Sequence, residues 1–524
     1  MLARLSRTRG QFVAFLVLLA IALWGAQHIL VAWQIGSVNS YLYSHWAFLF
    51  SFAVAAISMG LAQHEKPHNY ECEMLVDGHE PHITAIVPCY NEDANVLHSV
   101  LHALVLQSRP LHSVYLVDDG SSEVDYREVR DWFEPFARRH GVTPNWLWQP
   151  NAGKRQAQAQ AFRQAQDADV FITVDSDSII DFYAVEEIMK PFANPDIQSV
   201  AGVVLAKNNR TNVLARLTDL LFVTGQLTDR SMMSTLGSVL VNSGGLAAYR
   251  AEVVRDNLEA YLHETFLGKH IEFSDDSMLT LYALMRGKTV QQPSAFVLTM
   301  MPDRLSHHYR QQLRWMKGSF IRSWWRLKYL PLASFGFIRQ VLGWGQFVMT
   351  TILVLLVLFS RHRLNTEALP YLLLVPIVLG YTQALRYFSV QRTDESIWSQ
   401  LYTYALTPVA VIWSYFVLRP IRWYAVATCM RGGWGTRRIV EITMKQTPSN
   451  SPLPKLSVNT RFGLRVSMRY ELLMKAVYNA TSDAEERLAL WNQHYQSLSD
   501  RDKFALWRDY YKARCHYAKR VAPS

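Results

Sequence analysis

Pairs of acidic residues follow two apolar runs, and their spacing fits metal and phosphate chemistry. "VDDGS" (117–121) places Asp118 and Asp119 after one run, and "VDSDS" (174–178) places Asp175 and Asp177 after another. A D-x-D at the end of a strand projects two carboxylates to one side, so Asp175 and Asp177 could share a hard divalent cation, Mg²⁺ or Mn²⁺. The alternative is an ordinary turn, where Asp and Ser are common.

Two further segments carry charged groups that fit the transfer of a phosphorylated substrate. In "NAGKRQAQAQAF" (151–162), Gly153 and Lys154 open a helical pattern, where backbone N–H groups and a basic side chain could meet a diphosphate. In "EFSDDSML" (272–279), Asp275 and Asp276 precede another helical pattern and could supply a general base for a hydroxyl group. The alternatives are a solvated helix start for the first segment and a helix N-cap for the second.

A strip without acidic residues, "HHYRQQLRWMKGSFIRSWWR" (307–326), combines basic and aromatic side chains. Such side chains can stack on a nucleic-acid strand, lie on a membrane surface or hold an anionic ligand. We expect the first part, which contains Gln311, Arg314 and Trp315, to belong to the ligand site. We expect the second part to form an amphipathic helix on the cytoplasmic leaflet, with these side chains among the headgroups: Arg322, Trp324, Trp325 and Arg326.

The elements that must position these residues are short apolar runs alternating with helical patterns, from about residue 82 to 301. Four such runs are "ITAIVPCY", "VYLVDDG", "DVFITVDSD" and "SVAGVVLA". Strands that alternate with helices indicate a mostly parallel α/β sheet. Ligands of such sheets gather at the carboxyl ends of the strands, which is where the acidic pairs lie.

The composition indicates a membrane protein with a sizeable soluble part. Half of the 524 residues are hydrophobic, 18% are charged, and the net charge is +10. Residues 11–33 and 41–63 contain no Asp, Glu, Lys or Arg, and each is long enough to cross a hydrocarbon core of roughly 30 Å. A signal peptide is the alternative for the first stretch. The basic residues that precede it place both ends of a retained hairpin in the cytoplasm.

Further apolar stretches follow the strip, at about 335–360 and 369–388, and a third, 401–430, is interrupted by Pro408 and Pro420. We therefore expect a transmembrane hairpin (1–70), a cytoplasmic catalytic domain (80–304), an interfacial helical segment (305–334) and a second transmembrane hairpin (335–390). A re-entrant or interfacial segment (398–438) and a cytoplasmic helical tail (440–524) complete the chain. Four scattered cysteines without a C-x-x-C pair predict reduced thiols rather than disulfides or a zinc site.

In this order, the motifs resemble those of the processive membrane glycosyltransferases of family 2. The resemblance is greatest to class I hyaluronan synthases, with chitin, chitooligosaccharide and cellulose synthases as relatives, and it covers roughly residues 83–438. It implies an α/β domain of the glycosyltransferase-A type, which is Rossmann-like, inserted between transmembrane helical hairpins. It also implies an inverting transfer from UDP-sugars onto a growing polysaccharide, in the plasma or inner membrane, with Mg²⁺ or Mn²⁺.

The same resemblance implies roles for individual residues. Asp119, with Asp118 beside it, contacts the uracil, and Lys154 assists nucleotide or phosphate binding. Asp175 and Asp177 hold the metal on the diphosphate, with Asp177 the more direct ligand. Asp276, in the pair with Asp275, is the base that deprotonates the acceptor. "QQLRW" supplies three more residues: Arg314 for the diphosphate, and Gln311 and Trp315 on the acceptor side, where Trp315 stacks on the sugar.

Two loops extend the resemblance and also show departures from it. "VNSGGLAAYR" (241–250) is similar to an acceptor-side S-G-P-L loop, which implies that Ser243 and Gly244 contact the acceptor, but Gly245 replaces the usual Pro. A strand-turn that needs Gly for its backbone is the alternative. "GGWGTRR" (432–438) resembles a W-G-T-R loop, in which Trp434 and Arg437 reach the nucleotide, and a positive juxtamembrane anchor is the alternative.

The identity of the sugar stays open at this point. Hyaluronan requires both UDP-N-acetylglucosamine and UDP-glucuronate, but Ser277 stands where the hyaluronan synthases usually have an arginine, and "QQLRWMKG" leans towards chitooligosaccharide-type enzymes. A β-1,4-N-acetylglucosamine synthase and a single-transfer enzyme with a lipid acceptor remain alternatives. A transporter would need charged residues inside its spans, and the four predicted spans are nearly free of them. A nucleic-acid-binding protein would leave the ordered acidic motifs unexplained. The expected partners are UDP-sugars, the polysaccharide and the lipid bilayer, without nucleic acid, and the sequence does not define an oligomeric state.

Overall fold

The computed structural model describes residues 50, 52–68, 80–359, 364–392, 395–431 and 464–465. The first predicted span, the W-G-T-R loop with Trp434 and Arg437, and all but two residues of the tail lie outside this part. Within it, Cys89 and Cys429 are buried, and neither takes part in a disulfide.

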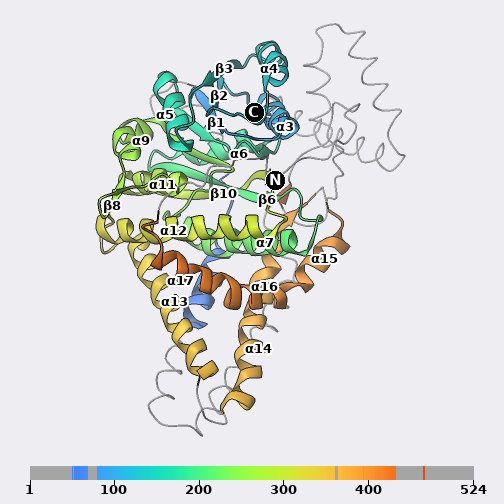
Figure 1. Cartoon of the computed structure of the whole chain (residues 1–524), viewed down its shortest axis with the longest axis vertical. Helices are drawn as coiled ribbons and strands as arrows, with labels where there is room; N and C mark the ends of the chain where they lie inside the picture. The colour runs from blue at the N-terminus through green and yellow to red at the C-terminus, as the bar shows by residue number, and fades with distance from the viewer. Residues whose placement is uncertain are drawn as a thin grey trace, which may run out of the picture.

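An eight-stranded sheet lies at the centre of the catalytic domain (Figure 1), with the strand order β3-β2-β1-β4-β7-β6-β10-β5. Its strands are β1 (Ile83–Cys89), β2 (Ser113–Asp118), β3 (Thr143–Trp148), β4 (Val170–Thr173), β5 (Ser178–Ile180), β6 (Ile197–Ala206), β7 (Ala247–Arg250) and β10 (Lys288–Thr299). Two small ribbons stand apart, β8 (Thr265–Phe266) with β9 (Lys269–His270) and β11 (Val390–Gln391) with β12 (Leu464–Arg465).

The predicted mostly parallel sheet is confirmed, with two reversed strands that make the sheet mixed. β7 runs antiparallel to both β4 and β6, and β5 runs antiparallel to β10. The pairs β1–β2, β1–β4, β2–β3 and β6–β10 are parallel. β4 and β6 therefore point the same way, and the carboxyl ends of β1, β2, β4, β6 and β10 share one edge. The two reversed strands have four residues and three residues, too short to show a pattern in the sequence.

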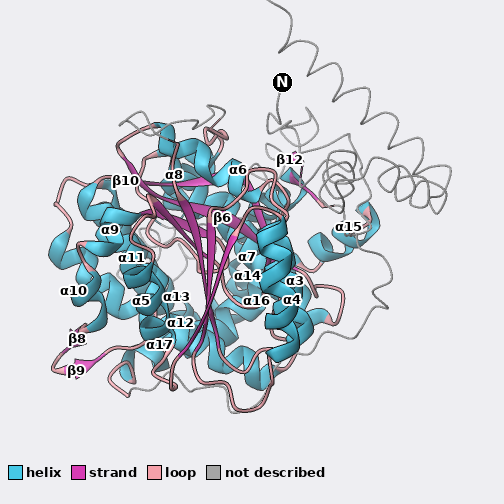
Figure 2. Cartoon of the chain, turned by 90° about the horizontal axis from the view of Figure 1, so that it is seen from above, coloured by secondary structure: helices cyan, strands magenta, loops and turns pink. Residues whose placement is uncertain are grey.

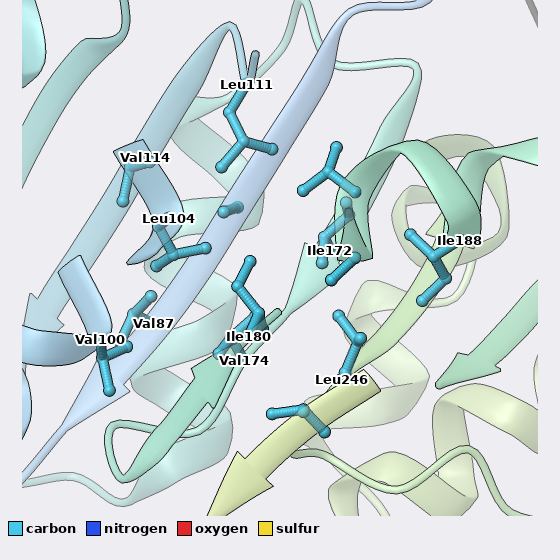
Figure 3. Packing of buried hydrophobic residues seen from close by; sticks show 14 of the residues in the cluster. Val87, Val100, Leu104, Leu111, Val114, Ile172, Val174, Ile180, Ile188 and Leu246 are labelled. Atoms are coloured by element: carbon cyan, nitrogen blue, oxygen red, sulfur yellow. The ribbon is translucent and has the colours of Figure 1, made fainter. Parts of the chain in front are cut away.

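Helices cover both faces of the sheet, which explains why its strands are continuous apolar runs instead of alternating ones. On β1, Ala85 and Val87 pack against one face with α3 (Ala94–Val105), α4 (Arg127–Arg139) and α6 (Ala184–Met189), whereas Ile86 packs against the other. Figure 3 shows the first of these cores, where Val87, Leu104 and Val114 meet.

The opposite face is covered by α5 (Lys154–Gln164), α9 (Ala251–Arg255), α10 (Leu258–Leu262) and α11 (Asp275–Arg286). Figure 2 shows α5, α9 and α11 on one side of the strands and α3 and α4 on the other. The remaining helices of the domain are α7 (Val213–Gly225) and α8 (Ser231–Thr235), joined by the π-helical turn Gln226–Arg230, with a 3-10 turn at Lys190–Ala193.

A second group of helices lies beyond the carboxyl side of the domain (Figure 1). It contains α12 (Leu305–Tyr329), α13 (Phe335–Phe359), α14 (Leu364–Ala384), α15 (Ile397–Ala405), α16 (Thr407–Trp413) and α17 (Arg419–Ala427). A 3-10 turn (Leu385–Ser389) and a π-helical turn (Ser414–Leu418) connect them. In Figure 1, α12 crosses beneath the sheet, and α13 and α14 extend away from it.

The later pair of predicted spans, 335–360 and 369–388, coincides with α13 and α14 in its described residues, but the crossing of a membrane stays a prediction. Among the residues that the structure describes, no single helix has both the length and the apolar composition of a membrane span. One bent pair, Ile397–Ala405 with Thr407–Ala427, meets both conditions together, with an angle of 43° between its halves. Its break matches the interruption expected at Pro408, which occupies the first turn of α16, where proline is tolerated.

Candidate active site

One cavity of about 410 Å³ collects most of the residues predicted to act together. Its walls are the carboxyl ends of the strands, the first turns of α5 and α11, the loop before β7 and one face of α12. Eleven of the predicted residues line it: Asp119, Lys154, Asp175, Asp177, Ser243, Gly244, Asp275, Asp276, Gln311, Arg314 and Trp315. Residues from six segments that are far apart in the sequence therefore share one space.

Lys154 links the D-x-D to the second acidic pair. Its Nζ lies 2.6 Å from Asp175 Oδ1 and 2.9 Å from Asp275 Oδ2. Burial disfavours the charged amine, but the two carboxylates outweigh this effect and raise the pKa of Lys154 well above its ordinary value. Gly153 has a φ of +94°, which favours glycine, and sets the lysine on the first residue of α5. The alternative of a solvated helix start is therefore wrong.

Asp275 and Asp276 are adjacent, yet their environments push their pKa values in opposite directions. Burial alone would raise the pKa of Asp275, but contact with Lys154 lowers it below its usual range. Burial and then repulsion from Asp275 raise the pKa of Asp276 to about 6. A titrating carboxyl beside one that stays ionised is the arrangement that assigns an acid and a base their roles.

The acidic pair does not cap the helix, so the N-cap alternative is wrong. α11 begins at Asp275, and the capping position is Ser274, with a left-handed backbone (φ +63°) and no capping side-chain bond. Asp276 Oδ1 instead accepts a hydrogen bond of 2.7 Å from the N–H of Ser277. Both carboxylates lie in the first turn, where the helix dipole favours negative charge.

Asp119 is tied to its own surroundings. Its carboxylate accepts hydrogen bonds from Gln149 Nε2 (2.6 Å), from the N–H of Ala152 (2.9 Å) and from the N–H of Gly153 (2.8 Å). It therefore shapes the loop that leads to Lys154, although it also faces the cavity. Asp118 is buried outside the cavity lining and accepts a bond of 3.0 Å from the N–H of Ser121.

The two carboxylates of the D-x-D face different partners in the structure. Asp175 contacts Lys154, whereas Asp177 Oδ1 accepts from Thr299 Oγ1 (3.1 Å) and from Ser178 Oγ (3.2 Å). Across the described residues, no group of three or more His, Cys, Asp or Glu side chains is placed to hold a metal. Two carboxylates with substrate phosphates are nevertheless a common set for Mg²⁺, and both line the cavity, so the residues present fit such a cation.

Gly244 lies against the charged centre. A Cβ on Gly244 would stand 3.1 Å from both carboxylate oxygens of Asp175 and 3.2 Å from Lys154 Nζ. A Cβ on Gly245 would make ordinary contacts of 3.4 Å or more. A side chain at 244 would therefore crowd the carboxylate and the amine of the site, whereas one at 245, where the resemblance expected Pro, would not.

α12 presents one face to the cavity. Gln311, Trp315 and Gly318 have the spacing of one helical face. Trp315 is 38% exposed, with its ring 5.7 Å from that of Phe222, and Gln311 Oε1 is a buried acceptor without a hydrogen-bond partner in the described structure. An open aromatic face beside an unpartnered amide oxygen suits a sugar ring with hydroxyl donors.

The prediction that the second half of this helix lies among lipid headgroups requires a correction for both arginines. Arg322 is 0% exposed and Arg326 3%, and Arg326 donates to the carbonyl of Leu240 (2.6 Å). Trp325 Nε1 donates to Glu264, and only Trp324 of the four is largely exposed, at 54%. The arginines point towards the catalytic domain because it offers them hydrogen-bond acceptors, such as the carbonyl of Leu240 and the carboxylate of Glu264.

Arg230 is a cavity residue that sequence reasoning missed. Its guanidinium donates to Ser243 Oγ (3.0 Å), to the carbonyl of Gly202 (3.1 Å) and to Gln226 Oε1 (3.2 Å). Burial lowers its pKa to about 10. It comes from the π-helical turn after α7, and no motif in the sequence marks this position.

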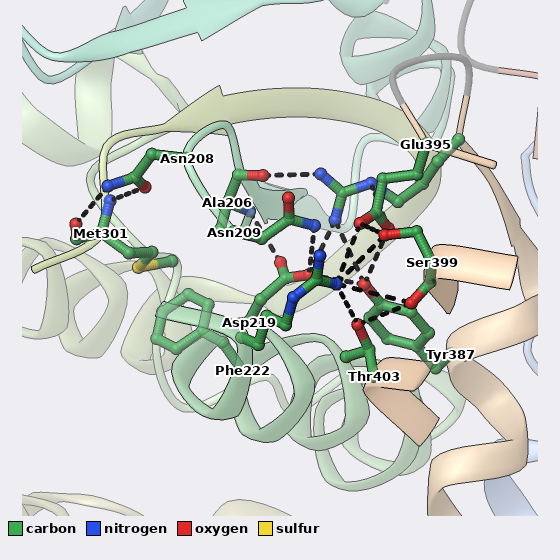
Figure 4. Close-up of polar contacts among 12 residues, drawn as sticks. Ala206, Asn208, Asn209, Asp219, Phe222, Met301, Tyr387, Glu395, Ser399 and Thr403 are labelled. Carbon is green, nitrogen blue, oxygen red and sulfur yellow. Dashed lines mark hydrogen bonds and ion pairs between the residues drawn. The ribbon is translucent and has the colours of Figure 1, made fainter. Parts of the chain in front are cut away.

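A cluster of buried polar groups, the Asp219 cluster, joins the cavity rim to the second group of helices (Figure 4). Asp219 accepts from Arg392 Nη1 (2.7 Å), Tyr387 OH (2.6 Å) and the N–H of Ala206 (2.8 Å). Arg392 also donates to the carbonyl of Ala206 (2.6 Å). Figure 4 shows Phe222, of the cavity lining, on the same helix as Asp219.

The comparisons with known proteins give the class and the family. The family described as "Glycosyltransferase like family 2" matches residues 81–318. The hyaluronan synthase of Streptococcus pyogenes is 34% identical over 384 residues, which cover 72% of this chain and 85% of the relative. The N-acetylglucosaminyltransferase of Rhizobium meliloti (strain 1021) is 29% identical over 63% of this chain and 84% of the relative. The protein is a glycosyltransferase with a mixed sheet of the GT-A kind. It belongs to glycosyltransferase family 2 and is a homologue of the hyaluronan synthases.

Solved structures offer more distant likenesses. A mannosyltransferase from Pyrobaculum calidifontis, PcManGT, in complex with GDP-Man and Mn²⁺, is 17% identical, with a TM-score of 0.44, over 72% of this chain and 99% of that one. GalNAc-T7 with UDP, GalNAc and Mn²⁺ has a TM-score of 0.31 at 11% identity, over 50% of this chain and 55% of that one.

Proposed function

We propose that this enzyme is a hyaluronan synthase, which polymerises N-acetylglucosamine and glucuronate from their UDP-donors into a β-linked chain. The observation that carries the proposal is the shared cavity, in which a lysine, a D-x-D and a carboxyl with a raised pKa face an open tryptophan. The homology to streptococcal hyaluronan synthases supports the choice of product.

In this proposal, the donor lies along the carboxyl edge of β1, β2 and β4. The uracil reaches the region of Asp118 and Asp119, while the diphosphate lies near Lys154, Arg314 and the D-x-D. Asp177, with Asp175, would hold the Mg²⁺ or Mn²⁺ ion, which, when bound, stabilises the charge of the leaving UDP. Trp434 and Arg437 would add to nucleotide binding from the W-G-T-R loop.

The acceptor enters from the α12 side. Trp315 stacks on its terminal sugar, beside Gln311, Ser243 and Gly244. Asp276 takes the proton of the attacking hydroxyl, whose oxygen forms a bond to the anomeric carbon as the bond to UDP breaks. Direct attack inverts that carbon, so an α-linked donor gives a β-linkage. A carboxyl that titrates near pH 6 is ionised at neutral pH and basic enough to accept a proton.

We also propose that the enzyme is embedded in the plasma or inner membrane, with the catalytic domain in the cytoplasm, and that it moves the polymer across. Large apolar side chains are exposed on α13, including Ile338, Val348 and Leu355, and on α15, including Trp398 and Leu401. Exposed large apolar side chains of this kind suit contact with lipid. In this proposal, two hairpins, at 1–70 and 335–390, flank the 80–304 domain, and the segment 398–438 lies at the interface.

A donor-omission experiment tests the product. The purified enzyme in nanodiscs receives Mg²⁺ or Mn²⁺ with UDP-N-acetylglucosamine, UDP-glucuronate, both, or UDP-glucose, and UDP release and product size are measured. We expect long polymer only with both donors, and we expect hyaluronidase to digest it. Polymer from UDP-N-acetylglucosamine alone would replace the proposal with a chitin-type synthase.

The chitooligosaccharide-type alternative rests on two observations, the 29% identity to the rhizobial N-acetylglucosaminyltransferase and Ser277. A single-transfer enzyme would instead give a short product that extracts with lipid in the same experiment.

A further inference from the structure

A buried carboxylate, Glu264, lies directly behind the acidic pair and is bound by two arginines. Arg155 Nη2 lies 2.8 Å from its Oε2, and Arg322 binds both of its oxygens, with Nη2 at 2.7 Å from Oε2. Trp325 Nε1 donates to Oε1 at 2.9 Å. The three charged side chains are 4%, 5% and 0% exposed for Glu264, Arg155 and Arg322, so water does not replace these contacts.

The two arginines also hold the backbone immediately before the acidic pair. Arg155 donates to the carbonyl of Phe273 (2.8 Å), and Arg322 donates to the same carbonyl (3.3 Å) and to the carbonyl of Ser274 (3.3 Å). Asp275 is the next residue. The left-handed backbone of Ser274 and the direction of the first turn of α11 are therefore fixed from behind by guanidinium groups that depend on Glu264 for their charge balance.

The same cluster reaches the other two parts of the cavity. Arg155 follows Lys154 in α5, so the contacts that hold the arginine also fix the helix start that carries the lysine. Arg322 is two helical turns beyond Trp315 on α12 and so shares its face. Between them, a Cβ on Gly318 would stand 2.5 Å from Ser274 Cβ, which shows how closely α12 packs on the start of α11.

The cluster has an electrostatic consequence as well. Two guanidiniums and one carboxylate give a net charge of +1 behind the acidic pair, and Arg155 contributes to the lowered pKa of Asp275. Other charged and titratable groups that act on Asp276 are Asp275, Lys154, Asp175, Arg230, Tyr249 and Arg326. Removal of the Glu264 charge changes the cluster from +1 to +2 and leaves those groups in place.

We propose that Glu264 is a positioning residue for the transfer reaction, which sets the place and the charge environment of Asp276 relative to Lys154 and Trp315 through Arg155 and Arg322. The inference rests on the proposed role of Asp276 as the base. Glu264 itself is not among the residues that line the cavity.

The test is the pH dependence of kcat/KM for UDP release by the full-length enzyme in nanodiscs. Glu264→Gln keeps the shape of the side chain and removes its charge, so the two arginines are no longer partly neutralised. The acidic limb, the part of the pH profile where kcat/KM falls as Asp276 is protonated, should therefore move down by on the order of one pH unit. The matched control is Glu259→Gln, which removes an exposed partner of Arg163 in the helix just before Glu264, and its limb should stay in place.

A second variant separates position from charge. Glu264→Asp keeps the carboxylate but withdraws it from the arginines, so it should lower kcat about tenfold or more while leaving the acidic limb and the affinity for UDP unchanged. If Glu264→Gln cannot be purified, Glu264→Asp and Arg322→Lys, which both conserve charge, serve instead. A lowered kcat with an unchanged affinity for UDP supports the positioning role, and a wild-type kcat in both variants contradicts it.

The outcomes distinguish this proposal from the proposed function. A wild-type limb near pH 6 that disappears in Asp276→Asn supports the base, whatever Glu264 does. Variants of Glu264 that only lower the melting temperature, with the wild-type kcat and limb, would overturn the positioning role. A wild-type profile without an acidic limb would remove the role of Asp276 and, with it, the premise of this test.

Discussion

Replacement of Asp276 by Asn should abolish transfer and, at the same time, stabilise the folded enzyme at neutral pH. Asp276 is ionised at pH 7.5 in a place that disfavours its charge, next to Asp275 and partly buried in the cavity wall. Asn keeps the shape and removes the charge. The gain in stability and the loss of the base come from the same carboxylate, so one substitution tests both.

The magnitude follows from the pKa shift. The folded-state pKa is about 6 against an ordinary value of 3.8, a difference of about two units. Each unit corresponds to 1.36 kcal/mol, which gives an upper limit of about 3 kcal/mol. Because the carboxyl group faces a cavity open to solvent, screening reduces the expected gain to about 1 to 2 kcal/mol. A gain of this size raises the melting temperature by roughly 2 to 8 °C in a domain of this size.

The sign of the pH dependence is fixed by the direction of the shift. Above pH 6, Asp276 is ionised in both the folded and unfolded states, and the full cost of its burial is present in the wild type. As the pH falls through 6, the folded state takes up a proton and the cost shrinks, to about half by pH 5. Below 3.8, both states are protonated and the difference vanishes. The stabilising effect of Asn should therefore be large at pH 7.5 and smaller at pH 5.

The assay compares melting temperatures at pH 7.5 and pH 5 at one scan rate, together with UDP release, which should fall by about 10² to 10⁴. Asp275→Asn is the matched control, because contact with Lys154 lowers the pKa of Asp275, and its removal should destabilise the enzyme at both pH values. Equal melting temperatures for Asp276→Asn and the wild type at pH 7.5, or a gain that does not change with pH, would refute the reasoning.

Three more predictions concern the donor, the acceptor and the metal. Gly244→Ala should raise the KM for the donor several-fold, because its Cβ crowds Asp175, whereas Gly245→Ala, with ordinary contacts, should leave it near the wild-type value in the same UDP-release assay. Trp315→Ala should shorten the polymer, measured by gel filtration, more than it lowers UDP release, and Trp315→Phe should restore length, since stacking is retained. EDTA should stop transfer, and Mn²⁺ or Mg²⁺ should restore it in the wild type but not in Asp177→Asn; restoration in that variant would remove Asp177 from the metal site.

The convergence of the acidic motifs was predictable from sequence for a simple geometric reason. "VDDGS" and "VDSDS" follow apolar runs that became β2 and β4, and both strands point the same way as β1. Parallel strands bring their carboxyl ends to one edge, so Asp119, Asp175 and Asp177 meet there even though the sheet as a whole is mixed. The short reversed strands lie beyond these three and did not disturb the inference.

The contacts between motifs were not predictable. Lys154 joins Asp175 to Asp275 through space, and nothing in the sequence spacing encodes that meeting. The prediction that the arginines at the end of the strip 307–326 lie among lipid headgroups was wrong for a different reason. A helix with basic residues on several sides can turn any of them to a membrane or to buried acceptors, and Glu264, which binds Arg322, stands in the unremarkable stretch "HETFLG".

The Asp219 cluster has a consequence for how force passes through the enzyme. Arg392 and Tyr387 belong to the segment that leads from α14 to α15, and they grip the same carboxylate that holds the end of β6. To separate them would take two buried partners, a guanidinium and a phenol, from the buried carboxylate of Asp219, at a cost of about 3 to 5 kcal/mol, several times the thermal energy. The connection between the catalytic domain and these helices is therefore rigid and does not act as a hinge. A force that displaces these helices would be transmitted to the rim of the cavity, where the sugars are joined.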